Sequence, residues 1–239
     1  MSPVRVASLF SGGKDSVYAT YVAMQRGWEV SHLISIRPAD PESMLYHVPN
    51  VHLTRLHGEA LGIPVVEETA ERGGPEELDA LRRAFARTPV DGVVVGSIAS
   101  DYQAHRVNRV AAALGLRVFA PLWRLDPRTL VRDYLRAGLQ IVVSSVSAAG
   151  LDASWLGRTW DPGVVGDLLR LHAERGVHPC GEGGEFETLV LDAPFFRERI
   201  QIEGASTLWD GASGTYRVEK ARLVPKGARP GSSEPRESF

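Results

Sequence analysis

The residues best suited to chemistry form one short run, SGGKDS at residues 11–16, between an apolar stretch and a helical pattern. Glycines at a strand–helix junction let backbone N–H groups converge on one point, which also faces the positive end of the helix dipole. The serine hydroxyls add further donors, and Lys14 adds a mobile cation. Asp15 would repel phosphate unless a cation lay between them, so its presence indicates Mg²⁺. The run therefore predicts a site for a phosphate chain.

Two better-known phosphate motifs are excluded by the spacing of the glycines. The Walker P-loop needs a glycine five residues before the Gly-Lys pair, and Ser8 stands at that position. A dinucleotide fingerprint needs a second spaced glycine after the run, and none follows at that spacing. The remaining alternative is a glycine-rich turn without a ligand.

A second run, GEGGEFET at residues 181–188, places three carboxylates and three glycines within its first seven residues. Carboxylates held close together raise one another's pKa, so one of them could act as a base near neutral pH. The same cluster could hold a cation, either Mg²⁺ or ammonium. The alternative is an acidic loop that contacts only water, and the residues alone do not say which glutamate would react.

Strand-like and helix-like segments alternate in the first half of the chain. Apolar runs predict strands at residues 4–10, 29–36, 63–67, 92–97 and 117–120. Helical spacing predicts helices at residues 15–26, 51–61, 75–87 and from Ser100 onwards. This alternation predicts an α/β fold, a parallel doubly wound sheet with helices on both faces. Ligands bind beyond the carboxyl ends of such strands, where SGGKDS and Gly96-Ser97 both lie.

After residue 125 the pattern changes to that of a smaller C-terminal α+β subdomain. Helices are expected at residues 127–137 and 164–175, and strands at residues 139–145, 188–191, 199–203 and 216–223, with a β-meander at the end. We therefore divide the chain into a phosphate-binding domain at residues 1–125, a second subdomain at residues 126–225 and a tail at residues 226–239. The tail is rich in Pro, Gly, Ser and charged residues, a composition typical of disorder.

Composition limits the class of protein further. The 239 residues, 44% of them apolar, suffice for one large α/β domain or a domain with an appendage. We expect a cytoplasmic protein without a membrane span, because no apolar run approaches the roughly 20 residues that a span needs and no secretory signal opens the chain. A single cysteine, Cys180, excludes an internal disulfide and a CxxC zinc site. A net charge of −2 without a basic stripe disfavours nucleic acid as a partner.

Both runs resemble motifs of a known enzyme family. SGGKDS looks like the pyrophosphate loop of the PP-loop ATP pyrophosphatases, a HUP-like superfamily that splits ATP between the α and β phosphates. EGGEFET at residues 182–188 is similar to the EGGE-aromatic-ET signature of the diphthine–ammonia ligase family. Further segments are similar to that family's motifs: MLYHVPN at 44–50, GSIASDYQ at 96–103 with Arg106, PLW at 121–123, and GLD at 150–152 with WLGR at 155–158. The resemblance runs from about residue 5 to about residue 200 and is to the short, archaeal-like form of the family.

The resemblance implies an ATP-dependent amide ligase. Such an enzyme adenylates the carboxylate of diphthine, a modified histidine on translation elongation factor 2, and ammonia then displaces AMP to leave diphthamide. The resemblance also implies ATP and Mg²⁺ as cofactors, and elongation factor 2 and ammonium as partners. No membrane or nucleic acid is expected to bind, and assembly into a homo-oligomer stays open.

We group the candidate site residues by their expected roles. The catalytic candidates are Lys14, Asp15, Glu182, Glu185 and Glu187, and Asp15 is also the candidate metal ligand. The candidates for nucleotide binding lie at or just after the ends of expected strands: Ser11, Gly12, Gly13, Lys14, Asp15, Ser16, Ser35, Gly96 and Ser97. The candidates for substrate binding lie in the matched segments: His47, Asn50, Asp101, Tyr102, Gln103, Arg106, Gly183, Gly184 and Thr188.

Several side chains have plainer roles open to them. His47 and Asn50 could order their loop through hydrogen bonds, and Arg106 could form a surface salt bridge. The two histidines of the helix at residues 51–61, His52 and His57, are expected at the surface. Cys180 is expected to be a buried thiol, although the related fold also includes thiolation enzymes.

Three other functions also stay open from the sequence. The first is a related ligase that acts on a small-molecule carboxylate. The second is a tRNA thiolase, which the lack of paired cysteines and of a basic surface disfavours. The third is an ATP sensor without turnover.

Overall fold

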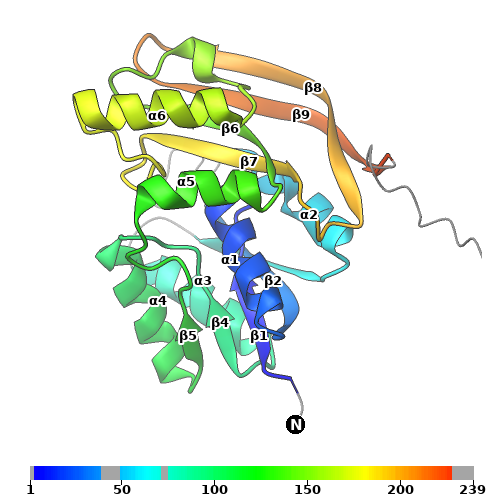
Figure 1. Cartoon of the computed structure of the whole chain (residues 1–239). Helices are drawn as coiled ribbons and strands as arrows, with labels where there is room; N and C mark the ends of the chain where they lie inside the picture. Colours follow the sequence, from blue (N-terminus) through cyan, green and yellow to red (C-terminus); the bar gives the residue numbers. More distant parts are fainter. Residues whose placement is uncertain (1–2, 39–48, 71–74, 228–239) are drawn as a thin grey trace, which may run out of the picture.

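The computed structural model describes residues 3–38, 49–70 and 75–227, which form two β-sheets with helices packed around them (Figure 1). The first sheet has five parallel strands in the order β3-β2-β1-β4-β5. Its strands are β1 (Arg5–Leu9), β2 (Glu29–Pro38), β3 (Val65–Ala70), β4 (Gly92–Val94) and β5 (Arg117–Phe119). The helices between them are α1 (Lys14–Gln25), α2 (Thr54–Leu61), α3 (Pro75–Ala86) and α4 (Asp101–Ala113), with a short 3₁₀ helix η1 (Val51–Leu53) before α2.

Helices cover both faces of this sheet, as the alternation of strands and helices predicts. Val6 and Leu33 belong to the larger apolar cluster, together with residues of α1 and α2. Their neighbours in the chain, Ala7 and Ile34, belong to a second cluster with residues of α3 and α4. Because successive residues of a strand point to opposite faces, the two clusters lie on the two sides of the sheet. The predicted doubly wound α/β fold is confirmed.

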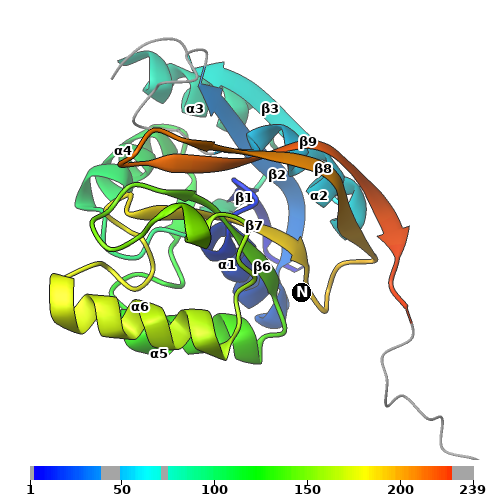
Figure 2. The ribbon, with the colours of Figure 1, turned by 90° about the horizontal axis from the view of Figure 1, so that it is seen from above.

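The second sheet has four strands, paired antiparallel in the order β7-β6-β9-β8. Its strands are β6 (Gln140–Val146), β7 (Phe186–Asp192), β8 (Glu198–Trp209) and β9 (Gly214–Pro225). Two helices, α5 (Pro127–Arg136) and α6 (Pro162–Arg175), lie next to each other (Figure 1) on one side of this sheet (Figure 2). In the chain, a 3₁₀ helix η2 (Ala153–Trp155) comes between β6 and α6.

The predicted β-meander is wrong. β8 and β9 form a long hairpin, but the start of β9 pairs with the end of β6, through Gly214 with Val146 and Thr215 with Ser145. β9 therefore lies between β6 and β8, and β8 is one of the two edge strands, opposite β7. The boundary of β3 also differs from the predicted residues 63–67: the strand begins at Val65, because Pro64 has no N–H to donate to the sheet.

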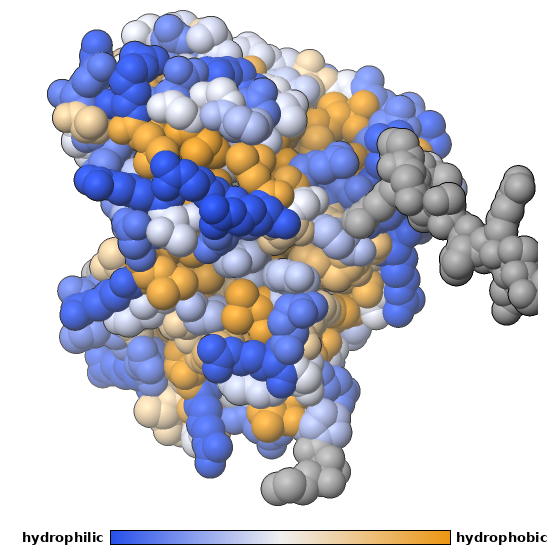
Figure 3. Space-filling view, viewed as in Figure 1, coloured by the Kyte–Doolittle hydropathy of each residue, from blue (hydrophilic) through white to orange (hydrophobic). Residues whose placement is uncertain are grey.

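One apolar core connects the two sheets. The larger cluster contains Val17 of α1, Tyr134 of α5, Leu168 of α6 and Phe186 of β7. On the face shown in Figure 3, apolar residues gather between α6 and α5 and are bordered by hydrophilic ones. Among the described helices, none has the length and apolar character needed to cross a membrane. The division at residue 125 stays a prediction, and most of the predicted tail, residues 228–239, lies outside the described residues.

Candidate active site

The SGGKDS run connects β1 to α1, and Gly13 caps the N-terminus of α1. Gly12 has a φ angle of +82°, in the left-handed region that favours glycine. A Cβ atom on Gly12 would lie 2.8 Å from Cε1 of His57, and one on Gly13 would lie 3.3 Å from the carbonyl oxygen of Thr188. The loop is thus held between α2 and β7, and no larger residue fits at Gly12 without displacing its neighbours.

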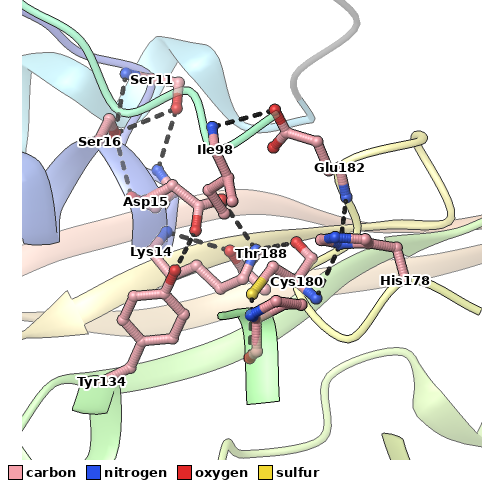
Figure 4. Close-up of polar contacts among 12 residues, drawn as sticks. Ser11, Lys14, Asp15, Ser16, Ile98, Tyr134, His178, Cys180, Glu182 and Thr188 are labelled. Atoms are coloured by element: carbon pink, nitrogen blue, oxygen red, sulfur yellow. Dashed lines mark hydrogen bonds and ion pairs between the residues drawn. The ribbon is translucent and has the colours of Figure 1, made fainter. Parts of the chain in front are cut away.

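Hydroxyl groups hold the backbone of this loop (Figure 4). Ser16 Oγ accepts the N–H of Ser11 at 3.3 Å and donates to the carbonyl oxygen of Gly13 at 3.0 Å. Ser11 Oγ accepts the N–H of Gly13 at 3.3 Å. Thr188 Oγ1 accepts the N–H of Lys14 at 3.1 Å. The N–H groups of Gly13 and Lys14 lie at the positive end of α1, a position that favours a bound anion.

Lys14 is fixed in place, unlike the mobile cation expected from the sequence. Its side chain is almost fully buried, and Nζ donates to Asp15 Oδ2 at 2.9 Å and to the carbonyl oxygen of Cys180 at 2.6 Å. Nζ also lies 5.0 Å from the centre of the Phe186 ring. Burial is the largest single influence and would lower the pKa of Lys14, but the charge and hydrogen bond of Asp15, together with Cys180 and Glu187, outweigh it, and the pKa is raised. A permanent positive charge therefore stands beside the loop.

Both carboxylate oxygens of Asp15 accept hydrogen bonds. The hydroxyl of Tyr134 donates to Oδ1 at 2.6 Å, and Lys14 Nζ donates to Oδ2. No group of three or more His, Cys, Asp or Glu side chains suited to a metal occurs within the described residues. Mg²⁺ in nucleotide sites is, however, commonly held by one or two carboxylates together with phosphate oxygens. Asp15 fits that role, because each of its oxygens keeps a lone pair.

The side chain of Glu182 extends from the GEGGEFET run at residues 181–188, here called the acidic loop, to the turn before α4. Its Oε1 accepts the N–H groups of Ile98, Ala99 and Ser100 at 3.0, 2.8 and 2.9 Å. Three donors at the positive end of a helix hold an ionised carboxylate firmly. Glu182 therefore ties the acidic loop to the turn that follows β4.

Glu185 stabilises the acidic loop from within. Its Oε1 accepts the N–H of His178 at 3.0 Å, and its Oε2 accepts the N–H of Gly183 at 2.8 Å. His178 contributes as an acceptor, because its Nδ1 faces the N–H groups of Cys180 at 3.2 Å and of Glu182 at 3.3 Å. Burial lowers the pKa of His178, in agreement with a neutral ring. The side chains of Glu185 and His178 thus both stabilise the conformation of the acidic loop through hydrogen bonds to its backbone.

Glu187 differs from the other two glutamates. It lies on β7 opposite Ser145 of β6. Its carboxylate has no hydrogen bond to another of the described residues. Loss of contact with water raises its pKa to about 7; Lys14 opposes this shift, and the charges of Asp15 and Glu182 add to it. A carboxylate with a pKa near neutrality is suited to accept a proton at physiological pH.

Three further candidates for nucleotide binding, Gly96, Ser97 and Ser35, lie on or just after strands of the first sheet. Gly96 packs against the first turn of α1, where a Cβ atom would lie 2.8 Å from backbone atoms of Asp15 and Ser16. Ser97 is buried, and its hydroxyl has no hydrogen-bond partner among the described residues. Ser35 of β2 is buried and accepts a hydrogen bond from the Thr54 hydroxyl at 3.2 Å. Among these three candidates, Ser97 thus differs from Ser35 in having a buried hydroxyl without a partner among the described residues.

Asn50 forms loop-ordering hydrogen bonds of the kind that the sequence left open, and its side chain is buried. Its Nδ2 donates to the carbonyl oxygen of Tyr216 at 3.0 Å, and its Oδ1 accepts the N–H of Val218 at 2.8 Å. These bonds attach the segment before α2 to β9. His47 lies outside the described residues.

The other substrate candidates lie at the edges of the site. Asp101 is exposed at the start of α4, and one of its oxygens lies 3.9 Å from an Arg124 nitrogen. Arg106 is half-buried on the same helix. The helix also includes Tyr102 and Gln103, whose side chains lie outside the described part of the structure. Gly183 and Gly184 form the exposed tip of the acidic loop.

Two residues of the site were not predicted. Tyr134 is a buried aromatic residue on a strongly amphipathic helix, a pattern that predicts core packing and does not reveal its bond to Asp15. The expectation that His57 lies at the surface is wrong, because the face of α2 that carries it is covered, and the ring is fully buried. His52 is exposed as expected.

Cys180 is buried, as expected for a structural thiol. Burial raises its pKa to about 12, and Sγ lies 3.6 Å from the carbonyl oxygen of Pro127. A thiol of this pKa is protonated at neutral pH and is a poor nucleophile. The site therefore gives no support to thiolation chemistry through Cys180.

The contact of Glu182 with the turn before α4 yields a first testable prediction. Glu182→Ala leaves three N–H groups without their acceptor and is expected to lower the free energy of unfolding by about 1–3 kcal/mol. Glu182→Gln keeps an oxygen acceptor and is expected to lose less. Chemical denaturation and amide hydrogen exchange at residues 98–100 measure both effects, with Glu219→Ala on β9 as control. Unchanged exchange at these amides in Glu182→Ala would contradict the assignment.

Comparison with known proteins gives matches along almost the whole chain. Models of the Diphthamide synthase N-terminal domain and C-terminal domain match residues 4–118 and 126–224. The Homo sapiens protein named diphthine–ammonia ligase is 33% identical over 92% of this chain and 91% of its own length. The Danio rerio protein of that name is 35% identical over 86% and 89%. The Schizosaccharomyces pombe protein of that name is 33% identical over 83% of this chain, but the match covers 36% of that longer protein.

Proposed function

The chain belongs to the diphthamide synthase family, and from this premise we propose that it is an ATP-dependent ligase that converts diphthine to diphthamide. In this reaction the carboxylate of diphthine displaces pyrophosphate from ATP to form an acyl-adenylate, and ammonia then displaces AMP. The relatives are named for diphthine and ammonia. Elongation factor 2, which carries diphthine, is accordingly the proposed protein partner, and the cytoplasm is the proposed location.

The observation that carries the proposal is the direct contact between the SGGKDS loop and the strand of the acidic run. Thr188 Oγ1 accepts the N–H of Lys14, and Lys14 Nζ donates to the carbonyl oxygen of Cys180. The N–H of Val190 also donates to the carbonyl oxygen of Gly12 at 2.9 Å. A phosphate-binding loop and a group of carboxylates joined in this way suit a reaction that brings a nucleotide and an amine to one carbonyl carbon.

On the nucleotide side, we assign the loop N–H groups and Lys14 to the phosphate chain. Their positive charge would stabilise the negative charge that develops on the leaving pyrophosphate. The unpaired hydroxyl of Ser97 lies on the adjoining turn and is free to donate to the nucleotide. Mg²⁺, held by Asp15 together with phosphate oxygens, would neutralise part of the charge on the phosphates.

On the amine side, we assign the base to Glu187. Ammonia attacks a carbonyl carbon only through its lone pair, so the proton of ammonium, or of the attacking nitrogen, must be removed. The pKa of Glu187 is raised to about 7, which suits it to this proton transfer. Glu182 and Glu185 are engaged in hydrogen bonds to backbone N–H groups and are assigned to the shape of the site.

The test is a reaction with purified components. The protein is incubated with ATP, Mg²⁺, ammonium and elongation factor 2 that carries diphthine. We expect AMP and pyrophosphate to form in equal amounts. Mass spectrometry of the modified peptide should show the replacement of the carboxylate OH by NH₂.

The controls separate this function from the alternatives. Elongation factor 2 with an unmodified histidine should give no AMP. AMP formation with small carboxylic acids but not with diphthine would identify a ligase for small molecules and contradict the proposal. Binding of ATP without any turnover would identify a sensor and contradict it as well.

A further inference from the structure

His57 is a buried ionisable residue to which the proposed mechanism gives no role. It lies on α2 with its ring fully buried. The ring packs edge-on against Phe10, at 5.4 Å between centroids, and against Phe196, at 5.9 Å. An imidazole enclosed in this way must find its hydrogen-bond partners within the protein.

Both nitrogens of the ring face carbonyl oxygens. Nδ1 lies 3.0 Å from the carbonyl oxygen of Leu53, and Nε2 lies 2.7 Å from the carbonyl oxygen of Val190. A carbonyl oxygen only accepts hydrogen bonds, and a neutral imidazole donates from only one nitrogen. One of the two contacts therefore sets a lone pair against a lone pair whenever His57 is neutral. Only the imidazolium form satisfies both carbonyls.

The ring is in direct contact with the SGGKDS loop at residues 11–16, here called the phosphate loop. Cε1, which lies between the two nitrogens, faces Gly12 so closely that a Cβ atom there would lie 2.8 Å from it. Val190 forms a second link between His57 and Gly12. Its N–H donates to the carbonyl oxygen of Gly12, and its own carbonyl oxygen faces Nε2 of His57. The charge of an imidazolium would thus lie directly behind the loop.

Nothing in the described surroundings of the ring supplies a compensating negative charge. The elements around it carry these charged side chains: Lys14 and Asp15 on α1, Arg55 and Glu59 on α2, Glu187 and Asp192 on β7, and Arg197 after β7. None of these groups contributes to the pKa of His57, which burial lowers and the two carbonyl oxygens raise in part. The free protein therefore holds a neutral ring in a site whose hydrogen bonds favour the cation.

We propose that His57 positions the phosphate loop through Gly12 and Val190 and takes up a proton when a phosphate chain binds there. This inference rests on the proposed function, because it requires a phosphate chain at residues 11–16. The negative charge of the phosphates would favour the imidazolium form, and the imidazolium would then donate to both carbonyl oxygens at once. Phosphate binding and a fully hydrogen-bonded His57 would stabilise each other.

The test is the number of protons taken up when inorganic pyrophosphate binds. Calorimetry in buffers with different ionisation enthalpies gives this number for the wild type and for His57→Gln, whose amide keeps one donor. Protonation of pyrophosphate itself and of other groups is common to both proteins. We expect the wild type near pH 7.5 to take up more protons than the variant, by up to about one per site. The affinity of the wild type should also fall more steeply as the pH rises.

A matched control and a direct measurement complete the test. His52→Gln changes an exposed histidine and should leave the proton uptake as in the wild type. Nitrogen NMR of the labelled wild-type ring should show one protonated ring nitrogen in the free protein and two with pyrophosphate bound. This measurement stands even if His57→Gln does not fold.

The possible failures can be told apart. Equal proton uptake in wild type and His57→Gln, or a ring that stays neutral with pyrophosphate bound, would overturn the role of His57 alone. If the wild type binds no pyrophosphate, the role of His57 and the proposed function both fail.

Discussion

Replacing Lys14 with methionine is expected to lower the rate of AMP formation by about 10²–10³-fold, because it removes a fixed positive charge from the leaving pyrophosphate. Lys14 is held by Asp15 and by the carbonyl oxygen of Cys180, so its charge needs no rearrangement when the phosphates bind. Methionine keeps an apolar stem of similar length beside Phe186 and removes the charge together with the two hydrogen bonds that Nζ donates. The measurement is AMP release together with exchange of labelled pyrophosphate into ATP.

The control for Lys14→Met is Lys220→Met. Lys220 lies on β9, mostly exposed, in an ion pair with Glu203 at 2.9 Å. Its replacement should leave AMP formation and pyrophosphate exchange unchanged. If Lys14→Met supports AMP formation at the wild-type rate while folded by circular dichroism, Lys14 has no part in the chemistry of the phosphates.

Replacing Glu187 with glutamine is expected to separate the two half-reactions. Amide formation should fall by about 10²–10⁴-fold, because the base that takes the proton from nitrogen is lost. Pyrophosphate exchange, which needs no ammonia, should continue. In the wild type, amide formation should rise with pH through about 7, as the Glu187 carboxylate loses its proton. The variant should lack this rise.

The stability of Glu187→Gln gives an independent check on the same group. The folded protein raises the pKa of Glu187 from its ordinary value of 4.5 to about 7, so between these pH values it binds more protons than the unfolded chain. The free energy of unfolding due to this group therefore falls as the pH rises through that window. Above pH 7 the variant should be at least as stable as the wild type. Glu59→Gln, at an exposed position on α2, serves as control; a large loss of stability in Glu187→Gln alone would show that its loss of activity reflects unfolding.

Local signals were enough to predict the strand–loop–helix junction at SGGKDS and the parallel sheet. The glycines of SGGKDS, the apolar runs of β1 and β4 and the helical spacing of α4 each depend on residues close together in the chain. The acidic loop was found in the same way, as an unusual density of Glu and Gly. Resemblance of several segments then indicated the family, which the matches to both domain models confirm.

The different surroundings of the three glutamates could not be predicted from the chain. The carboxylate of Glu182 is held by N–H groups more than 80 residues away in the chain. The pKa of Glu187 is raised by burial, next to Lys14. His57 was misassigned for a related reason: the strand that covers it follows more than 130 residues later. The prediction of a meander was wrong because β9 pairs with β6, a strand far away in the chain. The periodicity of a sequence does not show which distant strands pair.

The attachment of the phosphate loop to β7 has a consequence for synthesis of the chain on the ribosome. The loop is made more than 170 residues before Thr188 and Val190, which bond its backbone. A growing chain would therefore expose the SGGKDS sequence long before the loop has its supports. Incomplete chains would carry the nucleotide motif without a rigid site, so the ability to activate ATP would arise only when the second sheet has folded.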